Sequence, residues 1–390
     1  MVKRVGMEVS IAAAEAVKQA NVDVISAYPI TPQTHIVEHL SELVANGELD
    51  AEFFCVESEH SALSVCVGAA ATGARTFTCT SSQGLALMSE ITYIASGLRL
   101  PMLMIISNRT ISAPLSIWND HSDTMSIRDC GWIQFFVENG QEVYDHVFVS
   151  YRLSEDRNVL FPVIINMDGF ILSHVIEPIQ LIEQGKIDQF LPPYQPVHRL
   201  HPDHPVTMGA FALPSIFAET KKAQEEALRS SMPKITETWK AFGEMTGRYY
   251  HPVETYKTED ADTLLVTMGS FGETASVAVD KMREEGRSVG LIKIRLWRPF
   301  PFEAFKLATQ HAKKLVVIDR AISVGACGPV ASEVKAALYG NDQRPSVYNF
   351  VAGISGRDVT PSDFGKMVDK AEIEIDEGNK EGFEIYGVRG

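Results

Sequence analysis

Short strand-like segments alternate with helical patterns along the first half of this sequence. The segments are Val22–Ala27, Ala51–Val56, Arg75–Thr80, Leu100–Ser107 and Pro162–Met167. The last two are almost wholly apolar, as strands buried on both faces of a parallel sheet should be. Strands that alternate with helices in this way predict an α/β fold built on a doubly wound parallel sheet.

A second alternation begins near Asp260, with strands expected at 263–268, 288–294, 315–318 and 346–351. It predicts a second, smaller α/β domain at 260–370, after a first domain at 1–190. An extended and helical linker region is expected at 191–259, in which 217–247 reads as a polar surface helix without chemistry. Residues 371–390 are expected to form an acidic tail that is exposed or wraps a neighbour.

The composition of the chain limits the kinds of partner that it is expected to bind. The 390 residues carry a formal charge of −15, which argues against nucleic acid or an anionic membrane as the main partner. No uninterrupted apolar run is long enough to span a membrane. The five cysteines are scattered without Cys-x-x-Cys spacing, and no signal peptide is visible, so we expect a reducing cytoplasmic compartment and no iron–sulfur cluster on this chain.

A rigid turn, Tyr28-Pro29-Ile30-Thr31-Pro32, follows the first strand directly. Each proline fixes its own φ and pushes the preceding residue towards an extended conformation. Thr31 is therefore expected to present its hydroxyl with little backbone freedom. Because α/β proteins bind ligands at the carboxyl ends of parallel strands, we interpret this as a substrate-binding turn. A stiff strand-to-helix connection without a ligand is the alternative.

Two further strand ends carry candidate groups. Glu57 and Glu59 stand beside His60 at a strand-to-helix junction, where a carboxylate can serve function or simply favour the helix start. Arg109 follows a buried strand and is placed to grip a carboxylate with two parallel hydrogen bonds. Pairing of Arg109 with Asp120 or Asp123 is the alternative.

Two glycine-containing segments are interpreted as turns. Gly269-Ser270-Phe271-Gly272 lacks the full G-x-G-x-x-G pattern, so it is not assigned to a dinucleotide. Asp168-Gly169 follows a strand and is also expected to be a simple turn. The segment 108–142 is different, because an irregular connection of this length inside a compact domain is usually functional, and its aromatic content argues against disorder.

Motifs from much of the chain together resemble one family. They are Tyr28-Pro29-Ile30-Thr31-Pro32, Glu57-Ser58-Glu59-His60, Ser81-Ser82-Gln83-Gly84, Asn108-Arg109, Ser112–His121, Asn166–Phe170, Leu191–Tyr194 and Leu296–Pro301. In this order they resemble the α subunit of the 2-oxoacid:ferredoxin oxidoreductases, nearest the pyruvate branch. The resemblance implies a pyrimidine-binding domain for thiamine diphosphate, followed by a domain of the transketolase C-terminal type.

The resemblance also implies roles for individual residues. Glu59 matches the catalytic acid that hydrogen-bonds the aminopyrimidine ring of the cofactor. Thr31 and Arg109 match the residues that hold the 2-oxoacid, and Ile30 belongs to the same substrate turn. The remaining matches, on the cofactor side, are Pro29, Ser82 and Gln83. The family oxidises pyruvate to acetyl-CoA and carbon dioxide, uses coenzyme A as co-substrate, and passes electrons through iron–sulfur clusters to ferredoxin or a similar acceptor.

One motif of thiamine diphosphate enzymes is missing. They bind the diphosphate and its Mg²⁺ through Gly-Asp-Gly with an asparagine further on, and this sequence contains neither that motif nor another convincing set of metal ligands. The resemblance therefore implies that Mg²⁺ and the 4Fe–4S clusters are held by partner subunits of β, γ and δ type. This chain would supply half of a shared active site.

Two alternatives stay open at this stage. The substrate can be another 2-oxoacid, such as phenylglyoxylate, oxalate or a branched-chain acid, because the acyl pocket is shared with a partner. The residues that bear on this choice are Ile30, Ile111, Ile117 and Trp118. The chain can also be a non-catalytic scaffold subunit, although the joint presence of Thr31, Glu59 and Arg109 speaks against that reading.

Overall fold

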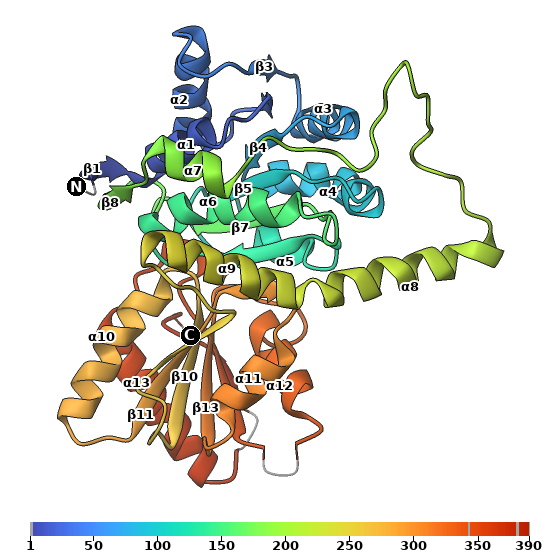
Figure 1. The fold of residues 1–390 in the computed structure, drawn as a ribbon. Coiled ribbons are helices and arrows are strands. Elements are labelled where there is room, and N and C mark those ends of the chain that lie inside the picture. Colours follow the sequence, from blue (N-terminus) through green and yellow to red (C-terminus); the bar gives the residue numbers. More distant parts are fainter. Residues whose placement is uncertain (1–2, 342–343, 380–381, 390) are drawn as a thin grey trace.

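A computed structural model describes residues 3–341, 344–379 and 382–389. Two α/β units lie one above the other in Figure 1, each built around its own sheet. The prediction of parallel sheets covered by helices is confirmed. Helix α9 (Met232–Thr246) lies along the junction of the two units, and helix α8 (Pro214–Ser230) reaches away from both.

The first unit contains a seven-stranded sheet with the strand order β12-β6-β7-β5-β4-β2-β3. Six of the strands run parallel, and β12 pairs antiparallel with β6. Their bounds are β2 (Val24–Ala27), β3 (Glu52–Cys55), β4 (Thr76–Thr80), β5 (Leu103–Asn108), β6 (Ile133–Phe136), β7 (Val163–Asp168) and β12 (Leu296–Arg298). Because β3 and β4 lie on opposite sides of β2, the order reverses between β2 and β4, which is where open α/β sheets bind ligands.

Seven helices belong to this unit: α1 (Val9–Gln19), α2 (Thr34–Ala45), α3 (Glu59–Thr72), α4 (Ser82–Gly97), α5 (Ser122–Ser126), α6 (Gly140–Ser154) and α7 (Gln184–Phe190). A two-stranded antiparallel ribbon, β1 (Lys3–Glu8) with β8 (Ile176–Leu181), joins its two ends. The motif Ser81–Gly84 does not form a separate turn, because helix α4 begins at Ser82.

The second unit contains a six-stranded sheet with the order β15-β14-β13-β10-β11-β9. Only β9 runs antiparallel to its neighbour. The strands are β9 (Val253–Tyr256), β10 (Thr263–Met268), β11 (Val289–Ile294), β13 (Lys314–Asp319), β14 (Ser346–Val351) and β15 (Phe383–Ile385). The helices are α10 (Phe271–Glu284), α11 (Phe302–Thr309), α12 (Pro329–Leu338), the short 3-10 helix η1 (Ile354–Gly356) and α13 (Pro361–Asp376).

Two expectations about the periphery are corrected, and one connection between the units is new. The surface helix expected at 217–247 is two helices, and α9 buries Ile235, Trp239 and Phe242 in the core of the first unit. The tail is not wholly exposed, because α13 packs Ala371 and Ile375 into a core cluster and β15 adds a strand to the second sheet. Strand β12 crosses from the second stretch of sequence into the first sheet, so the units share a β-ladder.

The described part of the chain contains no helix with both the length and the apolar character needed to cross a lipid bilayer.

Candidate active site at the carboxyl edge of the first sheet

The loops after β2, β3, β4 and β5 converge at the carboxyl edge of the seven-stranded sheet. Thr31 and Arg109 lie in the segments after β2 and β5, and Glu59 and Ser82 are the first residues of the helices that follow β3 and β4. Since β2 and β4 flank the point where the strand order reverses, two of these loops border the crevice that the fold itself creates. The sequence-predicted residues therefore come from separate elements to one side of one sheet.

The turn after β2 is held from below by Gln33, a wholly buried side chain. Its amide Nε2 donates to the carbonyl oxygen of Tyr28 at 2.9 Å, and its Oε1 accepts from the thiol of Cys79 at 3.2 Å. The backbone N–H of Gln33 also donates to the carbonyl of Ile30 at 3.0 Å. These bonds fix the turn while Pro29 and Thr31 stay exposed above it. Sequence reasoning missed Gln33, although a glutamine directly after Thr-Pro was visible.

Arg109 lies beside this turn and is 6% exposed. Its Nη1 donates to the carbonyl of Thr31 at 2.9 Å, and its Nε donates to the carbonyl of Ser116 at 3.0 Å. The alternative pairing with Asp120 or Asp123 is not what the guanidinium does: Asp123 accepts the backbone N–H of Arg109 instead. Burial lowers the pKa of the Arg109 guanidinium and the nearby Asp123 charge opposes this shift, but among the described residues the guanidinium itself bonds only to neutral carbonyls. The Arg109 guanidinium is therefore placed to pair with an anionic ligand at the sheet edge.

Glu59 is the first residue of α3, and its neighbour Ser58 caps the helix by accepting the N–H of Ser61 at 3.2 Å. The Glu59 side chain is 7% exposed and packs against Gly84 of α4. A Cβ at Gly84 would stand 2.7 Å from Glu59 Oε1, so only glycine allows this approach. No described residue donates a hydrogen bond to the Glu59 carboxylate, whereas the nearby Glu57 is exposed and accepts from Ser61 Oγ at 2.6 Å. A nearly buried carboxylate without a donor is suited to receive one from a ligand.

Ser82 opens α4 with φ +48°, a left-handed conformation that is uncommon for residues other than glycine. Its Oγ lies in hydrogen-bonding contact with the carbonyl oxygen of Thr110, and the side chain of Gln83 contacts the hydroxyl of Ser112. Both predicted cofactor residues thus bind the loop after β5. Backbone strain of this kind concentrates at ligand sites.

Asp123 is a residue that sequence reasoning considered only as a partner of Arg109. It is fully buried, and burial raises the pKa of its carboxyl to about 6. One oxygen accepts the backbone N–H groups of Ser82 at 3.1 Å and Arg109 at 2.9 Å. The carboxylate therefore joins the loops after β4 and β5.

The loop after Arg109 presents an apolar surface beside the site. Its exposed members include Leu115, Ile117 and Trp118, which is 50% exposed. The Trp118 ring lies 4.8 Å from that of Phe170, at the end of β7. This loop has the apolar side chains that an acyl pocket or a partner surface needs, and it is ordered here through contacts such as Ser116 Oγ with Ser355 Oγ at 2.6 Å.

Asp168 forms a second buried cluster, between the two units. Its Oδ1 accepts from His121 Nε2 at 2.7 Å, and its Oδ2 accepts from Arg320 Nη1 at 2.8 Å and from the Ser270 N–H at 2.9 Å. Burial alone would raise the pKa of Asp168, but the charges of Arg320 and His121 and their hydrogen bonds hold it well below its usual range. The expected simple turns at Asp168-Gly169 and Gly269–Gly272 are therefore the two sides of an interdomain contact.

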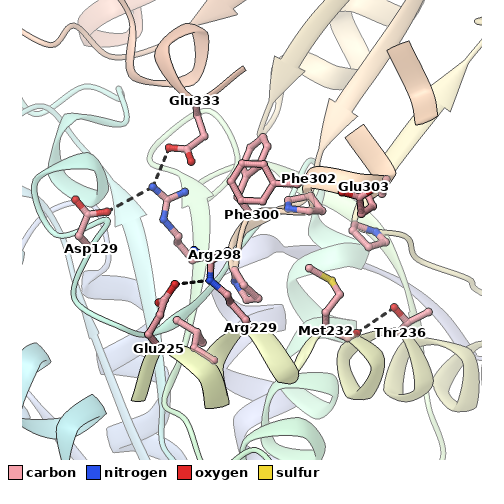
Figure 2. Close-up of a pocket in the computed structure, with 15 residues that line it drawn as sticks. Asp129, Glu225, Arg229, Met232, Thr236, Arg298, Phe300, Phe302, Glu303 and Glu333 are labelled. Carbon is pink, nitrogen blue, oxygen red and sulfur yellow. Dashed lines mark hydrogen bonds and ion pairs between the residues drawn. The ribbon is translucent and has the colours of Figure 1, made fainter. Parts of the chain in front are cut away.

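A separate cavity of about 570 Å³ lies between α8, α9, β12 and α11 (Figure 2). Its floor is made of prolines, phenylalanines and Met232. At its rim Arg298 pairs with Glu333 at 3.0 Å and lies 3.5 Å from Asp129, while Arg229 pairs with Glu225. None of the sequence-predicted site residues lines it, so this cavity is not where those residues meet.

Comparison with known proteins identifies the family to which the chain belongs. Residues 15–240 match the family described as "Pyruvate flavodoxin/ferredoxin oxidoreductase, thiamine diP-bdg", and residues 261–364 match "Pyruvate:ferredoxin oxidoreductase core domain II". The chain belongs to the pyruvate:ferredoxin oxidoreductase family. The predicted membership is confirmed, and the chain is of the α-subunit type of a thiamine diphosphate-dependent 2-oxoacid:ferredoxin oxidoreductase.

Curated relatives of this family cover almost the whole chain. Pyruvate synthase subunit PorA of Pyrococcus furiosus is 47% identical over 376 residues, which are 96% of this chain and 95% of that protein. The same subunit of Methanothermobacter thermautotrophicus is 48% identical over 361 residues, 93% of each chain. Ketoisovalerate oxidoreductase subunit VorA of Pyrococcus abyssi is 42% identical over 369 residues, 94% of this chain and 93% of that one.

Solved structures support the fold. The chain superimposes with a TM-score of 0.69 on the 2-oxoglutarate:ferredoxin oxidoreductase of Magnetococcus marinus, at 20% identity, covering 94% of this chain and 65% of that one. A split-gene transketolase gives a TM-score of 0.54 at 12% identity, covering 94% and 98%. The transketolase-like pair of domains predicted from sequence is thereby confirmed.

The site residues fit one half of a thiamine diphosphate site. The buried Glu59 carboxylate has no donor among the described residues, and the Gly84 backbone leaves room beside it. Among the described residues, no group of three or more His, Cys, Asp or Glu side chains is arranged to hold a metal ion.

Proposed function

We propose that this chain supplies the pyrimidine-side half of the active site of a pyruvate:ferredoxin oxidoreductase. The convergence of Glu59, Thr31 and Arg109 at one sheet edge carries this proposal. Partner subunits of β, γ and δ type would complete the site with Mg²⁺, the diphosphate-binding residues and the 4Fe–4S clusters. The reaction is the oxidation of pyruvate to acetyl-CoA and carbon dioxide, with coenzyme A as co-substrate and ferredoxin or a similar protein as electron acceptor.

Each residue has a separate task in this proposal. Thiamine diphosphate, when bound, supplies a carbon nucleophile and an electron sink for decarboxylation. The Glu59 carboxylate accepts a hydrogen bond from the aminopyrimidine ring and so holds a proton at the ring nitrogen. Arg109 binds the 2-oxoacid carboxylate through Nη2, the guanidinium nitrogen that its two carbonyl contacts leave free, and the Thr31 hydroxyl orients the substrate. Pro29, Ser82 and Gln83 shape the cofactor side, and Ile30 borders the substrate.

Pyruvate is favoured as substrate because the PorA relatives are more similar to this chain than the VorA relative is. A branched-chain 2-oxoacid is the second candidate, on the strength of that VorA similarity at 42%. A panel of pyruvate, 2-oxoisovalerate, phenylglyoxylate and oxalate, tested on the purified complex, decides between them. We expect kcat/KM to be highest for pyruvate.

A reducing cytoplasm is part of the same proposal. All five cysteines are free, and three of them are buried, where burial raises the thiol pKa and keeps the thiol protonated. No thiol is positioned to need an oxidising environment, and the acceptor clusters proposed for the partners are themselves sensitive to oxidation.

The decisive experiment replaces Glu59 by glutamine in the assembled complex. Glu59→Gln keeps the shape but removes the acceptor charge, so oxidation of 2-oxoacid should fall by about 1,000-fold. Glu57→Gln is the matched control, because Glu57 lies two residues away but is exposed and bonded to Ser61. Near-normal turnover of Glu59→Gln would show that this chain is a scaffold and that another subunit does the chemistry.

A further inference from the structure

Asp123 occupies a place in the site that no predicted role explains. It lies on the short helix α5, is fully buried, and accepts a hydrogen bond from two N–H groups far apart in sequence. The N–H of Ser82 is 3.1 Å from its Oδ2, and the N–H of Arg109 is 2.9 Å from the same atom. Ser82 opens helix α4 just after β4, and Arg109 opens the loop after β5; both border the site.

The other carboxylate oxygen of Asp123, Oδ1, accepts hydrogen bonds that hold the side chain in place. Oδ1 accepts from Asn108 Nδ2 at 2.9 Å and from the N–H of Thr124 at 2.7 Å. Asn108 Nδ2 also lies 2.8 Å from Thr124 Oγ1 and 3.3 Å from Asn166 Oδ1, and Asn166 donates to the carbonyl of Phe135 at 3.0 Å. The network therefore runs from Asp123 through β5 and β7 to β6, deep in the sheet.

Four neutral donors satisfy the Asp123 carboxylate, and no described cation forms an ion pair with it. A charge held only by N–H groups fixes their positions closely, because each charge-assisted bond is short and directional. Moving either Ser82 or Arg109 would leave a buried charge with a missing donor.

We propose that Asp123 is a positioning residue that sets the distance between the Ser82 turn and the Arg109 guanidinium. Through them it sets the placement of the 2-oxoacid carboxylate relative to the cofactor. This inference rests on the proposed function of Arg109 and Ser82. Asp123 itself touches neither substrate nor cofactor, since it lies beneath both loops and is fully buried.

The test is Asp123→Asn in the assembled complex. The amide has a single acceptor oxygen, so either the Ser82 and Arg109 N–H groups or the Asn108 and Thr124 donors then face its NH₂ group, and the network that holds both loops must rearrange. We expect the KM for pyruvate to rise about 30-fold and the KM for coenzyme A to stay within about twofold, since a loop displacement weakens transition-state and ground-state binding of the 2-oxoacid only. A purely structural residue would lower the amount of active complex and leave both KM values unchanged.

Asp120→Asn is the matched control. Asp120 is a buried acid three residues earlier, and its Oδ1 accepts only from the N–H and hydroxyl of Ser122, within its own segment. We expect its KM for pyruvate to stay close to the wild-type value. Equal KM values for Asp123→Asn and Asp120→Asn would overturn the proposal.

A second variant tests the proposal if Asp123→Asn does not assemble into the complex. Asp123→Glu keeps the charge and both oxygens but moves them outward by one methylene, so it should raise the KM for pyruvate by about tenfold. If Asp123→Glu leaves that KM unchanged, the positioning role is wrong. The proposed function is tested separately by Glu59→Gln. If Glu59→Gln loses turnover but Asp123→Asn keeps the wild-type KM for pyruvate, the positioning role is rejected and the proposed function stands.

Discussion

The guanidinium Nη1 of Arg109 donates a hydrogen bond of 2.9 Å to the backbone carbonyl oxygen of Thr31. This bond joins the loops after β5 and β2, which are 78 residues apart in sequence. A second bond, from Nε to the carbonyl of Ser116, holds the guanidinium plane in place. Arg109 is thus oriented before any substrate arrives, so little side-chain entropy is lost when a carboxylate binds.

Replacing Arg109 by lysine tests this orientation. Lysine keeps the charge, but its compact ammonium group cannot reach two carbonyl oxygens and still present a planar edge to a carboxylate. We expect the KM for the 2-oxoacid to rise about 50-fold in steady-state assays of the complex, with a smaller fall in kcat. Arg99→Lys is the control, because Arg99 also donates to backbone carbonyls, those of Val159 and Leu160, but lies away from the site. Similar effects of both substitutions would contradict a substrate-binding role.

Gly84 offers a test of the close approach between α3 and α4. A Cβ there would meet Thr80 Oγ1 at 2.5 Å and Glu59 Oε1 at 2.7 Å, so Gly84→Ala should push the Glu59 side chain aside. A shift of this kind is expected to lower kcat about 100-fold. Gly97→Ala, on the same helix, meets nothing within 4 Å and should leave kcat unchanged while stabilising the helix by up to about 1 kcal/mol. Measured kcat and melting temperatures of the two variants check both statements.

The strands, and the positions of Thr31 and Arg109 at the ends of strands, were predictable because their signals are local. Continuous apolar runs marked β5 and β7, and a proline pair marked the turn that carries Thr31. The partners that hold those residues were not predictable in the same way. Asp123 reads as an ordinary acid at a helix start, and its role depends on N–H groups 14 and 41 residues earlier.

Long-range pairing explains the other differences. Strand β12 has only three residues, and its place beside β6 is set by tertiary packing that no local pattern records. The helix α9 looked polar because its apolar side chains Ile235, Trp239 and Phe242 are widely spaced among charged residues. Their spacing of three to four residues was the signal that could have shown a buried face.

The burial of His146 predicts that the folded protein loses stability at acidic pH. Its ring is buried between α6 and α9, and Trp239 Nε1, which can only donate, contacts its Nε2 at 3.2 Å. Its Nδ1 therefore carries the hydrogen and donates to the carbonyl of Glu142 at 2.8 Å. Burial lowers the pKa of His146 to about 4, although the neighbouring Glu142 charge opposes that shift.

Because the unfolded chain binds this proton with a pKa of about 6.5, stability is lost as pH falls from about 6.5 to about 4. The loss between pH 7 and pH 5 should be about 2 kcal/mol from this residue. His146→Gln cannot titrate. The difference in the free energy of unfolding between wild type and variant, measured with urea, should therefore be about 2 kcal/mol smaller at pH 5 than at pH 7. A difference independent of pH would mean that His146 binds its proton equally well in the folded and the unfolded state.

Asp168 predicts how the two units are coupled. It lies at the end of β7 in the first unit, whereas its partners Arg320 and Ser270 belong to the second. Asp168→Ala would leave the Arg320 charge buried without a counter-charge, which costs about 3–5 kcal/mol. We expect urea unfolding of this variant to separate into two transitions, because the buried ion pair that links the two units is lost. Glu226→Ala removes an exposed pair with Lys222 and should cost no more than about 0.5 kcal/mol. A single unshifted transition for Asp168→Ala would show that other contacts, such as the Arg295–Glu142 ion pair and the β12–β6 ladder, hold the units together.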